Sequence, residues 1–367
     1  MSKYESFCQN LNKPYIPALD GVRFIAVFLV IFYHAGFDLV PGSHGVMLFF
    51  VLSGFLITWL MLKENEKTNT VSIKDFFKRR VLRIFPAFYA YCIVTLILLS
   101  IFGKEIPWSH ALSSIFYVSN YFYALHPESN NAFSHTWSLA IEEQFYLLFP
   151  LFFFIFRKNL KRMTTAIGGL ILTVWLWRVV LVYGFNVPDS YIYPAFDTRI
   201  DNLMVGCLLA LLIKQNLLRN FWETLLANPL MPFLTISLLL ISIFVGNPNF
   251  AHYRSIVGFA LDPVLMAVLI AQFIYFSQTA WWRWLEWKEI KYLGRISYPL
   301  YLYQQLTVFS IQKILSSQPI AVQMLAVILV TVILASLSYY FVETPFLRLK
   351  RKTEDKFPKI AEPAMQY

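Results

Sequence analysis

Two ionisable residues interrupt an otherwise apolar stretch near the start of the chain. Arg23 and His34 lie eleven residues apart in PALDGVRFIAVFLVIFYHAGF. In an α-helix this spacing returns to within about 20° of the same face and gives a rise of about 16 Å. An ionisable side chain inside a membrane-spanning helix is costly and by default marks a functional site. The pair therefore predicts a polar stripe with Arg at one end and His at the other.

The chemistry open to such a pair is acyl transfer from a thioester to a hydroxyl. A neutral imidazole can take the hydroxyl proton near physiological pH, which makes His34 a candidate general base. Arg23 could bind the phosphates of coenzyme A through its planar guanidinium, and the rise between the two residues resembles the reach of a pantetheine arm. The structural alternative is an Arg that snorkels to the interface and a His that caps a helix end.

The composition places these residues in a membrane protein. Hydrophobic residues make up 58% of the 367 residues and charged residues only 14%, whereas soluble domains carry about 25% charge. The 31 Lys and Arg against 21 Asp and Glu could indicate a nucleic-acid partner, but membrane proteins usually carry such an excess in cytoplasmic loops. We therefore expect contacts with membrane lipid and none with nucleic acid.

Eleven apolar stretches have about the length of a membrane span. The basic runs at 63–83 and 157–162 should both face the cytoplasm, which requires an even number of crossings between them, yet three apolar stretches lie there. We expect the shortest and most polar, 109–124, to be a re-entrant or interfacial segment on the outer side. About ten transmembrane helices then form an all-α bundle with both termini in the cytoplasm. The stretches are 17–36, 45–62, 84–103, 109–124, 137–156, 164–183, 199–213, 230–246, 255–277, 293–314 and 320–342.

No linker or compositional change divides the chain. We predict a cytoplasmic leader at 1–16, one transmembrane domain at 17–346 and a cytoplasmic tail at 347–367. The leader is too long for a removable signal peptide, and no small-residue cleavage site follows the first apolar run. The three cysteines lack metal or disulfide spacing, and phosphate-loop, dinucleotide, zinc-helix and G-x-S-x-G motifs are absent. We therefore expect no metal and no bound cofactor.

A second basic pair precedes one of the predicted spans. Arg80 and Arg83 in KRRVLR are three residues apart and are therefore neighbours on one helical face. They could hold coenzyme A phosphates together with Arg23. Alternatively, they fix the topology and contact anionic lipid.

Carboxylates also occur early in another span. In HTWSLAIEEQFY, Ser138 and Glu142 are four residues apart and share a helix face, while Glu143 points about 100° away. We interpret Glu142 as a catalytic residue that orients His34 or the acceptor. Capping of the helix dipole is the alternative for one carboxylate. Trp137, Ser138 and Glu143 are candidate acceptor-binding or supporting residues.

A third polar group lies at a predicted outer boundary. Asp197, Arg199 and Asp201 occur together in DTRIDNLMVG. We expect this Arg to form an ion pair that holds two helices. The three residues are also candidates for binding acceptor hydroxyls.

Taken together, these segments resemble the acyltransferase 3 family of integral membrane acyltransferases. The family hallmark is an Arg and a His separated by ten residues in the first helix, and Arg23 and His34 match it. The similarity continues through nearly the whole chain, in GVMLFFVLSGFLI (45–57), FFKRRVLRIFPAFY (76–89), HTWSLAIEEQFYLLFP (135–150), DTRIDNLMVGCLLA (197–210), LGRISYPLYLYQQ (293–305) and SYYFVETPFLRL (338–349).

The resemblance implies an O-acyltransferase in a bacterial cytoplasmic (inner) membrane. The donor would be a cytoplasmic acyl-CoA, acetyl-CoA in the first instance, and the acceptor an envelope or lipid-linked glycan at the outer face. Many family members carry an additional extracytoplasmic hydrolase-like domain. This chain ends shortly after its last predicted span, so we expect it to act alone or with a separate extracytoplasmic protein partner.

Two positions depart from the family pattern, and two other classes of function compete. Met47 stands where the family often has Asp, and Gln304 stands where it often has a His after Trp. Since Gln cannot titrate, His34 is left as the expected base. The main rival is a carrier or flippase for a lipid-linked glycan, which inverted repeats would favour, but none is evident. A non-catalytic scaffold or sensor is the third possibility.

Overall fold

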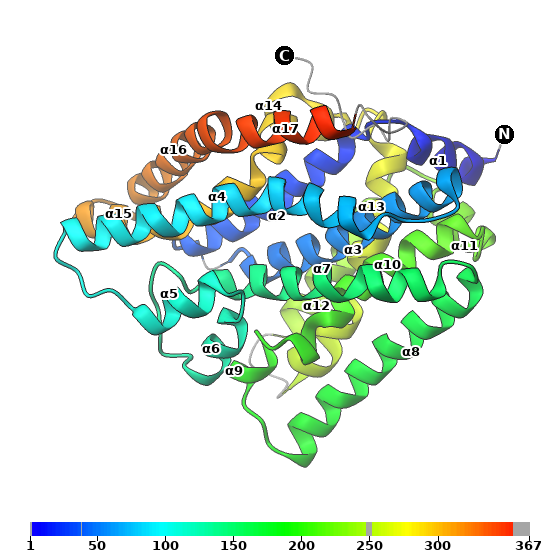
Figure 1. The fold of residues 1–367 in the computed structure, drawn as a ribbon. Coiled ribbons are helices and arrows are strands. Elements are labelled where there is room, and N and C mark those ends of the chain that lie inside the picture. The colour runs from blue at the N-terminus through cyan, green and yellow to red at the C-terminus, as the bar shows by residue number, and fades with distance from the viewer. Residues whose placement is uncertain (1, 38, 247–251, 355–367) are drawn as a thin grey trace.

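Every regular element of the described chain is helical. The computed structural model describes residues 2–37, 39–246 and 252–354, so the predicted tail lies outside the described residues from 355 onward. Figure 1 shows the elements in one bundle. They are α1 (Lys3–Asn12), α2 (Pro17–His34), α3 (Gly42–Thr68), α4 (Ile73–Ile101), α5 (Trp108–Ile115), α6 (Ser119–Leu125), α7 (Thr136–Phe156), α8 (Leu160–Val179), η1 (Val180–Gly184), α9 (Asp189–Ile192), α10 (Phe196–Lys214), α11 (Arg219–Leu225), α12 (Met231–Val245), η2 (Arg254–Gly258), α13 (Phe259–Phe276), η3 (Arg283–Glu286), α14 (Lys288–Arg295), α15 (Ser297–Ile314), α16 (Ile320–Ser338), η4 (Tyr339–Glu343) and α17 (Thr344–Glu354).

Seven helical segments of the described residues are long and apolar enough to cross a membrane. They comprise α2, α3, α4, α7, α8 with η1, η2 with α13, and α16 with η4 and the start of α17. The other three predicted spans correspond to α10, α12 and α15. Helices α10 and α15 each contain several polar residues, and α12 has only 15 residues. The chain is therefore an all-α integral membrane protein, while ten crossings remain a prediction.

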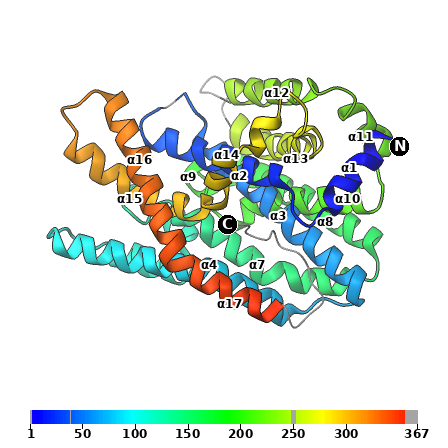
Figure 2. The same ribbon diagram turned by 90° about the horizontal axis from the view of Figure 1, so that it is seen from above.

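The polar segment expected to be re-entrant or interfacial forms two short helices. α5 has eight residues and α6 has seven, so their lengths of about 12 Å and 10 Å fall far below the roughly 30 Å of a hydrocarbon core. Figures 1 and 2 place α1, α11 and the basic α3–α4 and α7–α8 connections at one end of the bundle, and Figure 1 places α5 at the other. With α4 and α7 as the two crossings between the basic connections, both connections lie on the same side of the membrane. This even number of crossings is the one that the positive charges predict.

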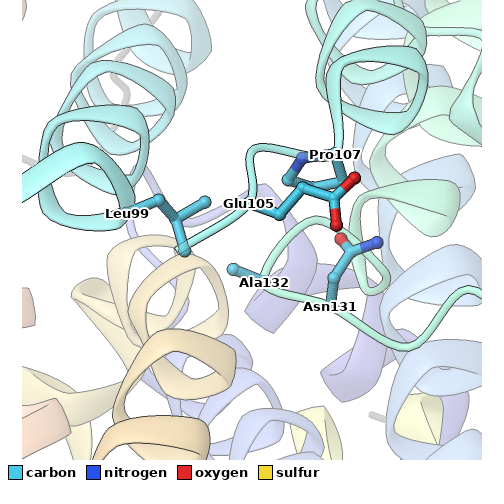
Figure 3. Close-up of a pocket in the computed structure, with 5 residues that line it drawn as sticks. All are labelled: Leu99, Glu105, Pro107, Asn131 and Ala132. Atoms are coloured by element: carbon cyan, nitrogen blue, oxygen red, sulfur yellow. The ribbon is translucent and has the colours of Figure 1, made fainter. Parts of the chain in front are cut away.

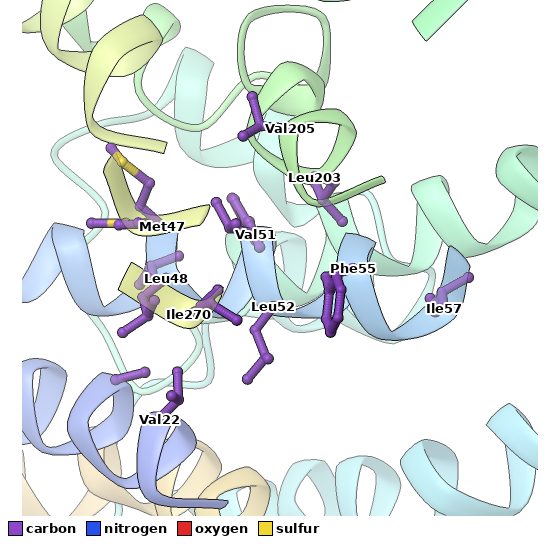
Figure 4. Close-up of a cluster of buried hydrophobic side chains, with 14 of the residues drawn as sticks. Val22, Met47, Leu48, Val51, Leu52, Phe55, Ile57, Leu203, Val205 and Ile270 are labelled. Atoms are coloured by element: carbon purple, nitrogen blue, oxygen red, sulfur yellow. The ribbon is translucent and has the colours of Figure 1, made fainter. Parts of the chain in front are cut away.

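The centre of the bundle is α3, which packs directly on α10. A Cβ atom built on Gly54 would lie 1.9 Å from the carbonyl oxygen of Leu203, and one on Gly206 would lie 1.9 Å from that of Val51. The two backbones therefore touch, as in small-residue contacts between membrane helices. Figure 4 shows α3 side chains between those of α2, α10 and α13.

The same kind of contact holds α2, the helix with the predicted polar stripe. A Cβ on Gly45 of α3 would lie 2.4 Å from the carbonyl oxygen of Ala26, and one on Gly294 of α14 would lie 1.9 Å from that of Asp20. Helix α2 is thus in backbone contact with α14 near its start and with α3 further along. These contacts fix the height of both Arg23 and His34 in the bundle.

A substitution at the α3–α10 contact should test its importance for stability. We expect Gly206→Ala to lower the free energy of unfolding by about 1–3 kcal/mol, because the methyl group must push the helices apart. Gly169→Ala is the matched control, since a Cβ there meets nothing within 4 Å and Ala favours a helix by about 1 kcal/mol over Gly. Thermal unfolding in detergent measures both variants. Equal melting temperatures would contradict this account of the contact.

Single-cysteine variants should test the predicted sidedness of the bundle. In a background with the three native cysteines replaced by Ser, we expect Glu128→Cys to react with a membrane-impermeant maleimide in intact bacterial cells. Lys158→Cys should react only after permeabilisation. Both native side chains are exposed, so the difference reports the side of the membrane. Labelling of Lys158→Cys from outside would refute the predicted topology.

Candidate active site

His34 is the last residue of α2, and its ring is held by its own helix. Nδ1 lies 3.0 Å from the carbonyl oxygen of Val30. A carbonyl only accepts, so Nδ1 donates and the neutral ring presents Nε2 as an acceptor. The side chain is half-buried, and the ring packs edge-on against that of Tyr33. His34 therefore offers an oriented basic nitrogen at this end of α2.

Arg23 lies in the second turn of α2 within a small hydrogen-bonded group. Its guanidinium donates to Asp20 over 2.9 Å, and the hydroxyl of Tyr15 donates to the same carboxylate over 2.6 Å. Arg295 of α14 approaches this carboxylate to 3.6 Å. Sequence reasoning missed Asp20, although its position three residues before Arg23 places the two on one helical face. The carboxylate orients Arg23 from one side.

The three predicted phosphate-binding arginines gather in one region. Arg80 and Arg83 of α4 lie within electrostatic reach of Arg23. Arg80 is also over the ring of Tyr146, at 4.5 Å from its centroid. Neither Arg80 nor Arg83 forms an ion pair within 4 Å among the described residues. Their guanidinium groups therefore have donors left for an anionic ligand.

The adjacent carboxylates of α7 face this arginine region. Glu142 and Glu143 are both half-buried and lie within electrostatic reach of Arg80. The hydroxyl of Ser53 bonds to that of Tyr146 nearby. The one described hydrogen bond of the His34 side chain runs from Nδ1 to the carbonyl oxygen of Val30, and none goes to Glu142. A role for Glu142 in orienting His34 thus remains a prediction without a direct contact.

Residues that precede and begin α7 form a polar junction with α15. The hydroxyls of Ser138 and Tyr301 are 2.6 Å apart, and Tyr301 donates to the carbonyl oxygen of His135 over 3.0 Å. Gln304, also on α15, is fully buried, and its amide oxygen has no partner among the described residues. Met47 is a buried core residue of α3. Both positions that depart from the family pattern therefore lie inside the bundle.

His135 is a candidate residue that sequence reasoning did not select. Its side chain is 4% exposed, and neither ring nitrogen has a hydrogen-bond partner among the described residues. The rings of Tyr91 and Tyr301 flank it at 5.4 Å, and His34 is within electrostatic reach. The sequence did contain a signal for this residue, because His135 is ionisable and lies at the predicted outer end of a membrane span.

The third polar group of the sequence, Asp197, Arg199 and Asp201, lies in two different environments. The ion pair expected of Arg199 is not formed within 4 Å among the described residues; Asp201 pairs instead with Arg178 of α8, at 2.7 Å. Asp197 accepts from the indole nitrogen of Trp177 over 2.9 Å. Sequence reasoning missed Arg178, which is fully buried near the end of an apolar helix.

Arg199 is the polar residue whose surroundings differ most from expectation. Its side chain is fully buried, and none of its three guanidinium nitrogens has a hydrogen-bond partner among the described residues. It lies 3.8 Å from the ring centroid of Phe259 and 5.6 Å from that of Tyr193. Cation–π contacts contribute about 2 kcal/mol when desolvated, less than the several kcal/mol that burial of an ion costs. Trp137 packs against Tyr193, with ring centroids 4.7 Å apart.

A cavity lies beside the segment that leads into α7. Its volume is about 280 Å³, and Figure 3 shows the carboxylate of Glu105 next to the amide of Asn131 at its wall. The Asn131 amide also bonds to Nδ1 of His110 over 3.0 Å. The cavity opens at the same end of the bundle as α5. Its other lining residues are Leu99, Pro107 and Ala132.

The described residues contain no group of three or more His, Cys, Asp or Glu side chains arranged to hold a metal ion. Within the same residues, the chemistry available is that of the arginines, histidines and carboxylates above. These groups can bind an anion at one end of α2 and accept a proton at the other.

Comparison with known proteins assigns the chain to a family. The chain is 33% identical to the peptidoglycan O-acetyltransferase OatA of Listeria monocytogenes over 91% of its own length and 56% of the relative. It is 33% identical to the putative peptidoglycan O-acetyltransferase YrhL of Bacillus subtilis over 90% of its own length and 55% of the relative. It is 31% identical to the O-acetyltransferase OatA of Staphylococcus aureus over 94% of its own length and 59% of the relative. It thus spans just over half the length of these relatives. No solved structure matches it significantly. The acyltransferase 3 profile, described as an acyltransferase domain, matches residues 16–340, so the chain belongs to the acyltransferase 3 family.

Proposed function

We propose that this protein is a membrane O-acetyltransferase. It would move an acetyl group from cytoplasmic acetyl-CoA to a hydroxyl of an extracytoplasmic or lipid-linked glycan, in a bacterial inner membrane. The observation that carries the proposal is the geometry of α2, with an arginine cluster near one end and the free Nε2 of His34 at the other. The names of the similar proteins, which include peptidoglycan O-acetyltransferases, support a glycan acceptor.

The donor would bind from the end of the bundle where α4 begins. Arg23, Arg80 and Arg83 supply charge-assisted donors for the phosphates of coenzyme A. The rise of about 16 Å along α2 lets an extended pantetheine arm place the thioester beside His34. Asp20 keeps the Arg23 guanidinium oriented through its 2.9 Å bond.

The transfer itself requires one base and one displaced thiolate. Nε2 of His34 takes the proton of the acceptor hydroxyl while the hydroxyl oxygen attacks the thioester carbonyl carbon. The new C–O bond forms and the C–S bond breaks. The coenzyme A thiolate then takes the proton from the imidazolium, which restores neutral His34. The products are an acetyl ester and free coenzyme A.

Removal of the base should abolish transfer. We expect His34→Ala to lower labelled-acetyl transfer from acetyl-CoA to glycan by at least about 100-fold in membrane vesicles, since general-base catalysis contributes about 10²–10⁴-fold. His126→Ala is the control, because that residue is exposed, lies 3.5 Å from Glu128 and packs on the ring of Phe122, neither of which is part of the proposed site. Thermal unfolding in detergent checks that both variants fold. Retained transfer by His34→Ala would sink this mechanism.

Two adjacent arginines allow a test of donor binding. We expect Arg80→Gln to raise the KM for acetyl-CoA about 10- to 100-fold, through loss of hydrogen bonds to a charged ligand. Arg79→Gln should leave this KM near the native value, because Arg79 is paired with Glu64 over 3.0 Å. An equal rise in both variants would instead indicate a general effect of positive charge.

The same vesicles separate the proposal from the carrier alternative. An acetyltransferase consumes acetyl-CoA and adds one acetyl mass to the glycan, which mass spectrometry detects. A flippase moves the lipid-linked glycan without consuming the donor. Glycan movement in the absence of acetyl-CoA, with no change in mass, would favour the carrier.

A further inference from the structure

Arg199 differs from the other fully buried arginine of the described residues in what surrounds it. Arg178 donates to the carbonyl oxygen of Thr198 over 2.7 Å and pairs with Asp201 at 2.7 Å. Arg199 has aromatic rings on its faces and no acceptor at any of its nitrogens among the described residues. Arg178 thus has a counter-ion and one hydrogen bond, although its Nε and Nη2 make no hydrogen bond among the described residues, whereas Arg199 has neither a counter-ion within 4 Å nor a hydrogen bond there.

Two carboxylates of the surrounding helices α10 and α13, Asp201 and Asp262, are occupied by other groups. Asp201 is bound by Arg178 and by the amide of Asn202. Asp262 of α13 accepts from Ser242 over 2.6 Å and lies 2.9 Å from Nε2 of His44. The surrounding helices therefore leave the guanidinium without a dedicated counter-ion.

A further cation strengthens the positive charge of this region. Arg254 of η2 lies 5.8 Å from the ring centroid of Phe259, the same ring that Arg199 covers. Arg254 also donates to the hydroxyl of Ser43. Two guanidinium groups thus share one aromatic ring, an arrangement that attracts an anion.

The location of Arg199 connects it to the His34 end of α2. Arg199 lies within electrostatic reach of His44. His44 precedes Gly45, whose added Cβ would meet Val30 at 2.9 Å. The carbonyl oxygen of Val30 is the group that holds the His34 ring. Arg199 therefore belongs to the half of the bundle where the acceptor would meet the base, away from Arg23.

We propose that Arg199 binds an anionic oxygen group, a carboxylate or a phosphate, carried by the acceptor glycan. A planar guanidinium suits both groups through paired N–H donors, and burial strengthens such bonds. The rings of Phe259 and Tyr193 hold the guanidinium plane, and Trp137 extends the aromatic surface toward α7. This inference rests on the proposed function, since it assumes a glycan acceptor at this end.

The first test compares the two buried arginines by stability without ligand. Arg178→Met should lower the melting temperature in detergent, because it leaves Asp201 buried without its cation. Arg199→Met should leave the melting temperature unchanged or raise it, because it removes a buried cation without a counter-ion. A fall in Arg199→Met comparable with that in Arg178→Met would assign Arg199 a structural role and overturn the proposal.

The second test measures binding without catalysis. Wild-type protein in detergent is titrated with three oligosaccharides of equal length: neutral, carboxylated and phosphorylated. We expect one anionic form to raise the melting temperature, and the identity of that form distinguishes carboxylate from phosphate. In Arg199→Met its apparent dissociation constant should rise about 10- to 100-fold, with a smaller rise in Arg199→Lys. Equal shifts in wild type and Arg199→Met, or no shift by either anionic form, would refute an anion site.

An activity measurement separates failure of this inference from failure of the proposed function. The ratio of kcat/KM for the anionic acceptor to that for the neutral acceptor should exceed one in wild type and fall to about one in Arg199→Met. If wild type transfers no acetyl group from acetyl-CoA, the proposed function fails, and the binding titration still decides whether Arg199 holds an anion. If transfer occurs with no preference for charge, only the inference fails.

Discussion

Direct contact between helix backbones is the constraint on which the arrangement of the site depends. Gly54 and Gly206 bring α3 against α10, Gly45 brings α3 against α2, and Gly294 brings α14 against α2. In a lipid environment helices gain little from hydrophobic association, so close packing of this kind must supply much of the adhesion. Because the contacts involve backbone atoms, they also fix the relative height of each helix. The positions of His34 and Arg23, both on α2, follow from these contacts.

The buried polar groups of this bundle divide into satisfied and unsatisfied ones. Asp201 of α10 pairs with Arg178 of α8, and Asp20 pairs with Arg23 on its own helix and lies 3.6 Å from Arg295 of α14, so both carboxylates link two helices. Both ring nitrogens of His135 and all three guanidinium nitrogens of Arg199 have no partner among the described residues. Unsatisfied polar atoms inside a membrane protein are expensive. Their gathering toward one half of the bundle is consistent with a place where a polar substrate completes the hydrogen bonding.

Sequence reasoning predicted the all-α class and identified 109–124 as too short and polar to span, because hydropathy and loop charge act locally. It also selected Arg23, Arg80 and Arg83, which the structure brings near one another. It did not predict that Asp201 pairs with Arg178 instead of Arg199. That choice depends on how α8 packs on α10, which no local pattern encodes. His135 carried a local signal as an ionisable residue next to a span, but its lack of hydrogen-bond partners among the described residues is a tertiary property.

The separation of Arg23 and His34 along α2 has a consequence for energetics across the membrane. In the proposed reaction the polyanionic part of the donor stays at one end, and the group that passes outward is a neutral acetyl. The proton taken from the acceptor returns inward as part of a neutral thiol. No net charge then crosses the bilayer in a complete turnover. An enzyme built this way would run on the free energy of the thioester alone and would be indifferent to the membrane potential.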